Sequence, residues 1–267
     1  MPKIKLIATD IDGTILKYNY EFNKKVKDCI KNLTKDGIKV VLVTGRMHAA
    51  TQHITEELGL DTPIVCYQGG LVKHNNKILY ERNLDPKSAK DIINWARKNN
   101  IHTNLYLNDK LYVEKDSPTI QRYIKQGISH FCIKSFDEIK LEKINKLLLI
   151  NYEDENKVTM WKEYLETKYQ NIHFIKSTPF YCEVCHSEAT KACAVNFLKD
   201  YWGLKREEIM TIGDQNNDID LLAAGGIKVA MGNATEELKA VANYVTDTVN
   251  NDGFVKAVEK FVCITSP

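Results

Sequence analysis

The sequence lacks the features that would tie the protein to a membrane or to a charged polymer. No apolar run approaches the ~20 residues that a helix needs to cross a bilayer. The formal net charge is only +2, which gives no case for a nucleic-acid partner or a polybasic membrane anchor. The N-terminus enters an expected strand directly and has no signal-peptide core. We therefore expect a cytoplasmic protein that binds neither nucleic acid nor membrane.

Internal repeats, low-complexity tracts and an evident disulfide framework are also missing. The seven cysteines are an odd number and are scattered along a chain without a secretory signal, so we expect reduced thiols. What remains is an ordinary globular composition, with 43% hydrophobic and 27% charged residues. A chain of 267 residues can form one large domain or two moderate ones, each with an ample core.

A β/α rhythm runs through both ends of the chain. Its first part reads β-α-β-α-β, which predicts a parallel sheet with right-handed crossovers. The rhythm stops near Leu84 and returns after about His186. Between these points hairpins mixed with helices favour an inserted α+β unit with an antiparallel sheet. The core strands are expected at residues 4–8, 38–43, 63–67, 209–212 and 227–231.

Helices are predicted from apolar spacing and from residues that start or stop a helix. Asn23 can cap a helix whose apolar residues share one face, and Asp85-Pro86 forms a second helix start. Other helices are expected at residues 49–58, 118–126, 156–169, 189–201, 236–242 and 253–261. The inserted part should also contain a hairpin at 105–113 and strands at 146–152, 172–175 and 180–184, after a hairpin at 71–80.

Polar side chains gather at the ends of the predicted core strands. Asp10 and Asp12 follow the first strand, Thr44 follows the second, and Asp214 and Asp218 follow the fourth. In open α/β sheets ligands bind at this end of the strands. Taken alone, the turn that contains Asp10 and Asp12 could be an ordinary solvated one. Four carboxylates at one sheet edge instead favour a hard cation, and oxygen ligands favour Mg²⁺.

Phosphate chemistry is the natural use of such a cation. Mg²⁺ held by a few acids usually partners a phosphate group. The Thr44 hydroxyl, the backbone N–H groups after it and the Lys191 ammonium could bind phosphoryl oxygens. A carboxylate that attacks phosphorus and is later freed by water would divide one difficult step into two. The pattern therefore predicts a phosphoryl-transfer site.

The ordered motifs resemble those of the haloacid dehalogenase (HAD) superfamily, in particular its Cof-like sugar-phosphate phosphatases. The resemblance covers the whole chain, including a cap between the second and third motifs. It implies an α/β fold with a Rossmann-like parallel-sheet core formed by residues 1–83 and 188–267, and an inserted α+β cap formed by residues 84–187, which would supply specificity. The motifs are Asp10-Ile11-Asp12-Gly13-Thr14, Val43-Thr44-Gly45-Arg46, Lys191, Gly213-Asp214-Gln215-Asn216-Asn217-Asp218 and the tail Met231-Gly232-Asn233-Ala234 with Asn251-Asp252-Gly253.

The resemblance also implies roles for single residues. Asp10 would be the nucleophile, and Asp12 would hold a proton at rest, give it to the leaving oxygen and then act as a base toward water. Mg²⁺ would be bound by Asp10, by Asp12 through its backbone carbonyl, by Asp214, and by Asp218 through water. Phosphoryl oxygens would be held by Thr44, Gly45, Lys191 and Asn217, and the substrate's polar body by Arg46 and Gln68.

Two positions depart from the family pattern, and one segment spells another motif. Lys191 precedes Ala192 where the family usually has glycine, and Gln68-Gly69 replaces the usual Asn-Gly. The segment from Cys182 to His186 matches the haem-attachment spelling Cys-x-x-Cys-His, but haem attachment requires an exported protein. Strand alternation puts Cys182 and Cys185 on opposite faces, so we expect a structural role. Glu183 should face the return to the core and could reach the substrate.

The expected function is Mg²⁺-dependent hydrolysis of a small phosphomonoester through an aspartyl-phosphate. The resemblance covers sugar phosphates, pyridoxal phosphate and flavin mononucleotide alike, so a small phosphorylated metabolite is the expected partner. A phosphomutase or phosphotransferase would use the same first half-reaction with another acceptor. A non-catalytic phosphometabolite-binding regulator is the remaining alternative, since receiver proteins also place Asp, Thr and Lys around Mg²⁺.

Overall fold

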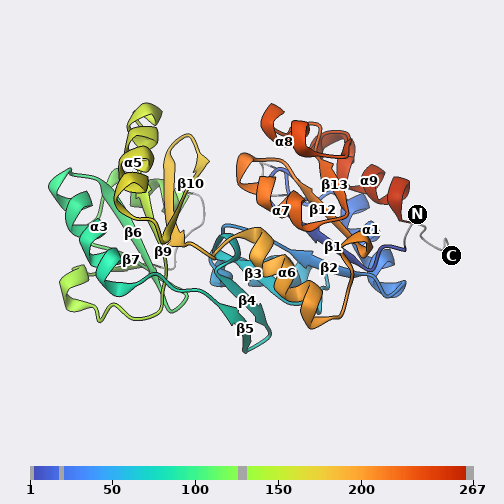
Figure 1. Cartoon of the computed structure of the whole chain (residues 1–267), viewed down its shortest axis with the longest axis horizontal. Helices are drawn as coiled ribbons and strands as arrows, with labels where there is room; N and C mark the ends of the chain where they lie inside the picture. Colours follow the sequence, from blue (N-terminus) through green and yellow to red (C-terminus); the bar gives the residue numbers. More distant parts are fainter. Residues whose placement is uncertain (1–2, 18–20, 126–130, 263–267) are drawn as a thin grey trace. The chain divides into compact units, whose positions relative to one another are not determined.

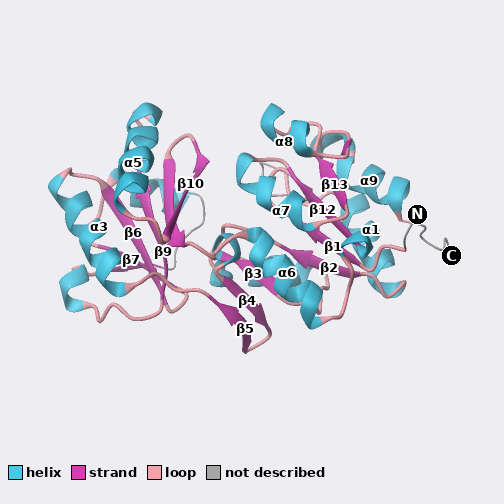
Figure 2. Cartoon of the chain, in the orientation of Figure 1, coloured by secondary structure: helices cyan, strands magenta, loops and turns pink. Residues whose placement is uncertain are grey.

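The computed structural model describes residues 3–17, 21–125 and 131–262, with the backbone alone at 122–125. The chain forms two compact units. The core unit consists of Met1–Arg46, Thr51–Tyr80 and Thr190–Pro267, and the inserted unit consists of Met47–Ala50 and Glu81–Ala189. Figure 1 follows the chain through both units, and Figure 2 marks their helices and strands. None of the described helices combines the length and the apolarity needed to cross a membrane.

The core unit contains a five-stranded parallel sheet, which confirms the α/β fold class. The strand order is β14-β13-β12-β1-β2, and every neighbouring pair is parallel. In the register, Thr9 at the end of β1 lies beside Leu42 of β2 and Ile212 of β12. The residues that follow these strands therefore share one edge of the sheet. The bounds are β1 Leu6–Thr9, β2 Lys39–Leu42, β12 Ile209–Gly213, β13 Ile227–Ala230 and β14 Tyr244–Val245.

Helices pack around this sheet as the sequence predicted, with small shifts at their ends. Asn23 caps α1 by accepting a hydrogen bond from the Lys25 N–H group. Buried side chains of α6 and α7 form one apolar cluster with β1 and β2. The core helices are α1 Lys24–Lys35, α2 Gln52–Glu57, α6 Lys191–Tyr201, α7 Ile219–Ala224, α8 Glu236–Val241 and α9 Gly253–Phe261.

The prediction that residues 63–67 form a third strand of the parallel sheet is wrong. Strand β3 (Ile64–Cys66) belongs to a separate sheet in the order β3-β4-β5, with β4 at Leu71–His74 and β5 at Lys77–Glu81. It pairs antiparallel with β4, and among the described residues an isolated parallel bridge between Val43 and Val65 links it to the segment after β2. After Cys66, Tyr67 and Gln68 take positive φ values of 54° and 57°, so the chain turns back at once. The actual fifth strand, β14, has two residues, too few to show a pattern.

The inserted unit contains a six-stranded mixed sheet in the order β10-β11-β9-β6-β7-β8. All its pairs are antiparallel except β7 with β8. Asp85 caps α3 with Pro86 in the first turn, as predicted, and one face of the sheet packs in an apolar cluster with α3 and α5. The last residue of the predicted helix at 118–126 lies outside the described residues. The elements are α3 Pro86–Lys98, β6 His102–Leu107, β7 Lys110–Val113, α4 Pro118–Lys125, β8 Phe131–Ile133, β9 Ile144–Ile150, α5 Glu155–Lys168, β10 Ile172–Thr178 and β11 Tyr181–His186.

The Cys-x-x-Cys-His segment lies in β11, which is an ordinary buried strand. Cys182 packs in the cluster beneath α3 and α5, whereas Cys185 packs with Ile175 and Ala189. Burial raises the pKa of the Cys182 thiol to about 12, and it also raises the pKa of the Cys185 thiol. Both thiols are enclosed and lie on opposite faces of the strand, so they cannot be joined to one haem.

Candidate active site

Asp10 lies directly after β1, an inner strand of the core sheet between β12 and β2. Its N–H group donates to the carbonyl of Ile212 at 3.0 Å, which continues the pairing of β1 with β12. The chain then turns tightly, because the N–H groups of Ile15 and Leu16 both donate to the carbonyl of Ile11. Gly13 has a φ of 81° in this turn, a value that suits glycine. Strand and turn together aim the Asp10 side chain along the carboxyl edge of the sheet.

A buried lysine joins Asp10 to the acidic loop after β12. Thr190 caps α6, so Lys191 is the first residue of that helix. Its Nζ atom donates to Asp10 Oδ1 at 2.7 Å and to Asp218 Oδ1 at 2.5 Å. The Lys191 side chain is only 1% exposed. The lysine predicted from sequence to bind phosphate therefore holds two of the predicted metal ligands.

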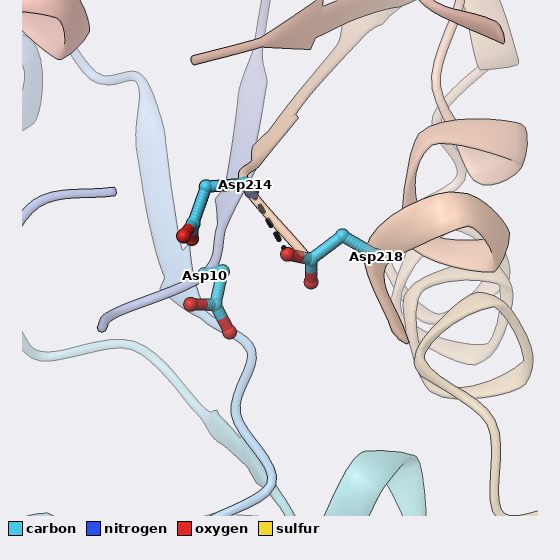
Figure 3. A group of neighbouring side chains, drawn as sticks. All are labelled: Asp10, Asp214 and Asp218. Carbon is cyan, nitrogen blue, oxygen red and sulfur yellow. Dashed lines mark hydrogen bonds between the residues drawn. The ribbon is translucent and has the colours of Figure 1, made fainter. Parts of the chain in front are cut away.

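The loop after β12 supplies the other two carboxylates. Asp218 Oδ2 accepts the N–H groups of Asp214 and Gln215, both at 3.0 Å, so Asp218 holds its own loop closed. Asp214 Oδ1 accepts the hydroxyl of Thr14 at 2.9 Å, and Oδ2 accepts the amide of Gln215 at 3.0 Å. In Figure 3 the side chains of Asp10, Asp214 and Asp218 surround one small region. One ligand oxygen from each lies within 4.8 Å of the others.

Burial makes this cluster resist full ionisation. It raises the pKa of Asp10 well above its ordinary value, and although Lys191 opposes the rise, Asp218 and Asp214 add to it. Burial likewise raises the pKa of Asp214 to about 6, helped by Asp218. Burial alone would lower the pKa of Lys191, but Asp10 and Asp218 outweigh it and hold that pKa above its ordinary value. If all three carboxylates were ionised, they and the one ammonium would carry a net charge of −2.

The residues of this cluster fit a divalent cation. Every donor is a carboxylate oxygen, which is the ligand type that Mg²⁺ prefers. The net charge of −2 that the ionised cluster would carry matches the charge of the ion, and the hydrogen bonds from Thr14 and Gln215 orient Asp214. Asp12, expected among the ligands through its backbone carbonyl, does not bring its carboxylate into the cluster.

Asp12 instead pairs with Arg46. The Arg46 Nε atom donates to Asp12 Oδ2 at 2.8 Å, and Nη2 donates to Oδ1 at 2.5 Å. This two-point geometry is the strongest pairing that arginine makes with a carboxylate. The Asp12 side chain is 43% exposed, so the pair faces solvent while Asp10 is buried. Sequence reasoning assigned both residues to the site but missed their contact with each other.

The predicted phosphate-binding loop after β2 is closely packed. The Thr44 N–H group donates to the carbonyl of Val65 at 2.9 Å, and the Thr44 carbonyl accepts the N–H of Gln68 at 3.1 Å. The Asn217 amide donates to Gln68 Oε1 at 3.1 Å. A side chain at Gly45 would meet Gln68, because an added Cβ would lie 2.4 Å from Gln68 Nε2. Gln68 thus lies between Gly45 and Asn217.

Glu183, predicted to reach the substrate, is a buried residue of the inserted unit. It lies in β11 of the inserted unit, where Lys146 Nζ donates to its Oε2 at 2.5 Å. Both side chains are buried, and the Lys146 ammonium also lies 5.0 Å from the centre of the Tyr106 ring. The expected alternation of β11 therefore holds, but the structure gives Glu183 a lysine partner that spacing alone could not reveal.

The sequence did not predict the side-chain hydrogen bonds that three further residues make at the site. Thr14 and Gln215 hold the carboxylate of Asp214, and Asn233 donates to the carbonyl of Gly13 at 2.9 Å. Each lies within or beside a quoted motif, and that proximity is the one signal that could have pointed to them. The partner atoms are up to 220 residues away in sequence, so no local spacing encodes these bonds.

Comparison with known proteins gives the family. The profile of the family described as haloacid dehalogenase-like hydrolase matches residues 7–258. This match confirms the resemblance drawn from the motifs. It also agrees with the fold, since a haloacid dehalogenase-like hydrolase from B. subtilis has a TM-score of 0.87 at 25% identity, covering 97% of this chain and 100% of that one.

Curated relatives are similar over nearly their whole length. A putative phosphatase of Haemophilus influenzae is 29% identical over 258 residues, covering 96% of this chain and 97% of the relative. The 5-amino-6-(5-phospho-D-ribitylamino)uracil phosphatase YitU of Bacillus subtilis is 27% identical over 264 residues, covering 96% and 97%. These similarities extend through the inserted unit as well as the core.

Proposed function

Because the chain belongs to the haloacid dehalogenase-like hydrolases and is a phosphatase of that family, we propose that it hydrolyses small phosphomonoesters with Mg²⁺ through a phosphorylated Asp10. The observation that carries this proposal is the buried cluster of Asp10, Asp214 and Asp218 around Lys191. Mg²⁺ would be held by these carboxylates and by the backbone carbonyl of Asp12, and would supply charge stabilisation to the phosphoryl oxygens.

Asp10 is the nucleophile in this proposal. A carboxylate oxygen of Asp10 attacks phosphorus, an aspartyl–phosphorus bond forms, and the bond from phosphorus to the ester oxygen breaks. Lys191 fixes the Asp10 carboxylate by its 2.7 Å hydrogen bond, so the attacking group is oriented before substrate arrives. The burial that raises the Asp10 pKa opposes ionisation, and the Lys191 ammonium offsets this by favouring the carboxylate.

Asp12 is the acid and then the base. It gives a proton to the departing ester oxygen, takes a proton from water in the second step, and so returns to its first state when phosphate leaves. Both Asp12 oxygens accept hydrogen bonds from Arg46 in this structure. When Asp12 holds its proton it gives up one of these bonds, and the other bond keeps its carboxyl beside Arg46.

The remaining residues bind the phosphoryl group and the substrate. The Thr44 hydroxyl, the Gly45 N–H group, the Lys191 ammonium and the Asn217 amide are the proposed phosphate contacts, and Asp218 supports the metal through water. Arg46 and Gln68, with Glu183 from the inserted unit, are proposed to contact the body of the substrate. The names of the relatives favour a small phosphorylated metabolite such as a sugar phosphate, since one relative acts on a phosphorylated ribityl compound.

Phosphate release from a set of phosphorylated metabolites tests the proposal. The wild-type protein with Mg²⁺ should release phosphate from some members, and Asp10→Asn should abolish the release while the protein still folds. A matched control is Asp36→Asn, which alters a carboxylate at the C-cap of α1 that lies in none of the motifs. Retained turnover in Asp10→Asn would overturn the assignment of the nucleophile, and an isomeric product in place of free phosphate would indicate a mutase.

A further inference from the structure

The segment that follows Arg46 belongs to the inserted unit. Met47–Ala50 is part of that unit, whereas the residues on both sides of it belong to the core unit. The chain leaves the core unit directly after Arg46 and returns to it at Thr51. Arg46, which binds Asp12, is therefore joined by one peptide bond to a segment of the inserted unit.

Asp109 binds this segment through both carboxylate oxygens. Its Oδ2 atom lies 3.1 Å from Nδ1 of His48, and its Oδ1 atom accepts the N–H group of Ala49 at 3.2 Å. The His48 side chain is buried, and the N–H of Ala50 donates to the carbonyl of Met47, which closes the 3-10 turn η1 (His48–Ala50). The middle of the short segment is thus fixed by one residue of the β6–β7 hairpin.

Asp109 is itself held in place. It lies in the two-residue turn between β6 and β7, where Asn108 and Asp109 have φ values of 51° and 59°. Two positive φ values in a two-residue loop define a tight hairpin turn. The Asp109 N–H group donates to Oδ1 of the buried Asn145 at 3.1 Å. The Asp109 carboxylate is therefore presented to residues 48 and 49 from a rigid support.

Arg46 is fixed from the other direction by the core unit. Its N–H group donates to Oγ1 of Thr44 at 3.2 Å, and its carbonyl accepts the N–H of Tyr67 at 3.0 Å. The guanidinium then reaches both oxygens of Asp12. The backbone of Arg46 is thus held by the core unit, and the segment that begins at the next residue is held by Asp109.

We propose that Asp109 is a positioning residue for the reaction, which sets the place of Arg46 through residues 47–50 and thereby the place of the Asp12 carboxylate. The inference rests on the proposed role of Asp12 as acid and base. Misplacement of a catalytic group by about 1 Å can cost roughly 10²-fold in rate. A carboxylate in the inserted unit thus contributes to proton transfer without touching the substrate.

A pair of glycine variants tests this without straining the turn. Asp109→Gly removes both acceptor oxygens, and glycine accepts the positive φ at this position. Asn108→Gly makes the same backbone change one residue earlier and leaves the Asp109 carboxylate in place. The probes are phenyl phosphate and p-nitrophenyl phosphate, because phenolate needs a donated proton to depart far more than nitrophenolate does.

The Asp109→Gly variant should hydrolyse the two probe substrates with different losses of rate. We expect Asp109→Gly to lower kcat about 10-fold for phenyl phosphate and less than about threefold for p-nitrophenyl phosphate, with KM nearly unchanged. Asn108→Gly should leave both rates near wild type. Arg46→Ala should show the same pattern more strongly, and adding Asp109→Gly to it should cause no further loss, because both act through one contact.

Two results would overturn the inference. An equal loss for both probes, with a lower Tm, would mean that Asp109 only stabilises the inserted unit. Losses that multiply in the Arg46→Ala, Asp109→Gly double variant would mean that Asp109 does not act through Arg46. Either result leaves the proposed phosphatase mechanism standing, whereas full turnover in Asp10→Asn would count against that mechanism and not against the Asp109 contacts.

Discussion

The Nζ atom of Lys191 lies 2.5 Å from Oδ1 of Asp218, and both side chains are about 1% exposed. A charge pair so enclosed is costly to form and still more costly to break. The same ammonium also donates a hydrogen bond to Asp10, the proposed nucleophile, which gives the pair a use that offsets this cost. The stability of the fold and the proposed chemistry therefore depend on the same few atoms.

Lys191→Met should reduce both stability and activity. It leaves the carboxylates of Asp10 and Asp218 buried without their cation, which should cost about 3–5 kcal/mol of unfolding free energy. Denaturant unfolding with a metal chelator measures this. Lys239→Met, which breaks a surface pair with Glu236, is the control and should cost at most about 1 kcal/mol. Equal unfolding free energies for the two variants would contradict the proposed importance of the buried pair.

Asp214→Asn should stabilise the metal-free protein at neutral pH but not in acid. Burial raises the pKa of Asp214 to about 6, above its unfolded value near 3.9. The protonated form therefore contributes stability that is present below about pH 4 and is lost as the pH rises through about 6. In chelator at pH 8 the variant should gain up to about 3 kcal/mol in unfolding free energy.

The same substitution should reverse its effect when Mg²⁺ is added. The wild-type protein gains the free energy of metal binding, and the variant loses a ligand, so the wild type should become the more stable of the two. Thermal unfolding with and without Mg²⁺ at pH 8 provides the comparison. A stability difference that stayed the same at pH 4.5 and pH 8 would count against a raised Asp214 pKa.

Gly45→Ala should disturb Gln68. The new methyl group would lie 2.4 Å from Gln68 Nε2, so the amide must move and lose its bond with Asn217. We expect kcat/KM to fall about 10-fold, in line with misplacement of a contact by part of an ångström. Gln68→Ala removes the obstacle, so the double variant should be no worse than Gln68→Ala alone. A double variant worse than either single change would show that Gly45 acts independently of Gln68.

The sequence predicted the parts of the site that depend on strand ends. Asp10 and Asp214 follow neighbouring parallel strands, so the topology brings them together once the strands are recognised. The bonds from Arg46 to Asp12 and from Asn217 to Gln68 depend on side-chain positions that no spacing records. Likewise, an apolar run indicates a strand but not its partner, which is why β3 was placed in the wrong sheet.

The path of the chain after Arg46 could not be read from sequence either. The β/α pattern assigned residues 49–58 to one helix of the core, whereas the structure places a 3-10 turn at His48–Ala50 and α2 at Gln52–Glu57. In this region residues 48 and 49 contact Asp109, some 60 residues away in sequence. Such a contact follows from packing and leaves no periodic signal.

The most direct test of the mechanism is to trap the phosphorylated protein. Asp12→Asn should still be phosphorylated by p-nitrophenyl phosphate, because nitrophenolate leaves without a proton, but it should lack the base for the second step. We predict a burst of about one nitrophenolate per protein molecule and a phosphoryl group located by mass spectrometry on the peptide that carries Asp10. Steady turnover without a burst, or a phosphoryl group on any other residue, would contradict the account.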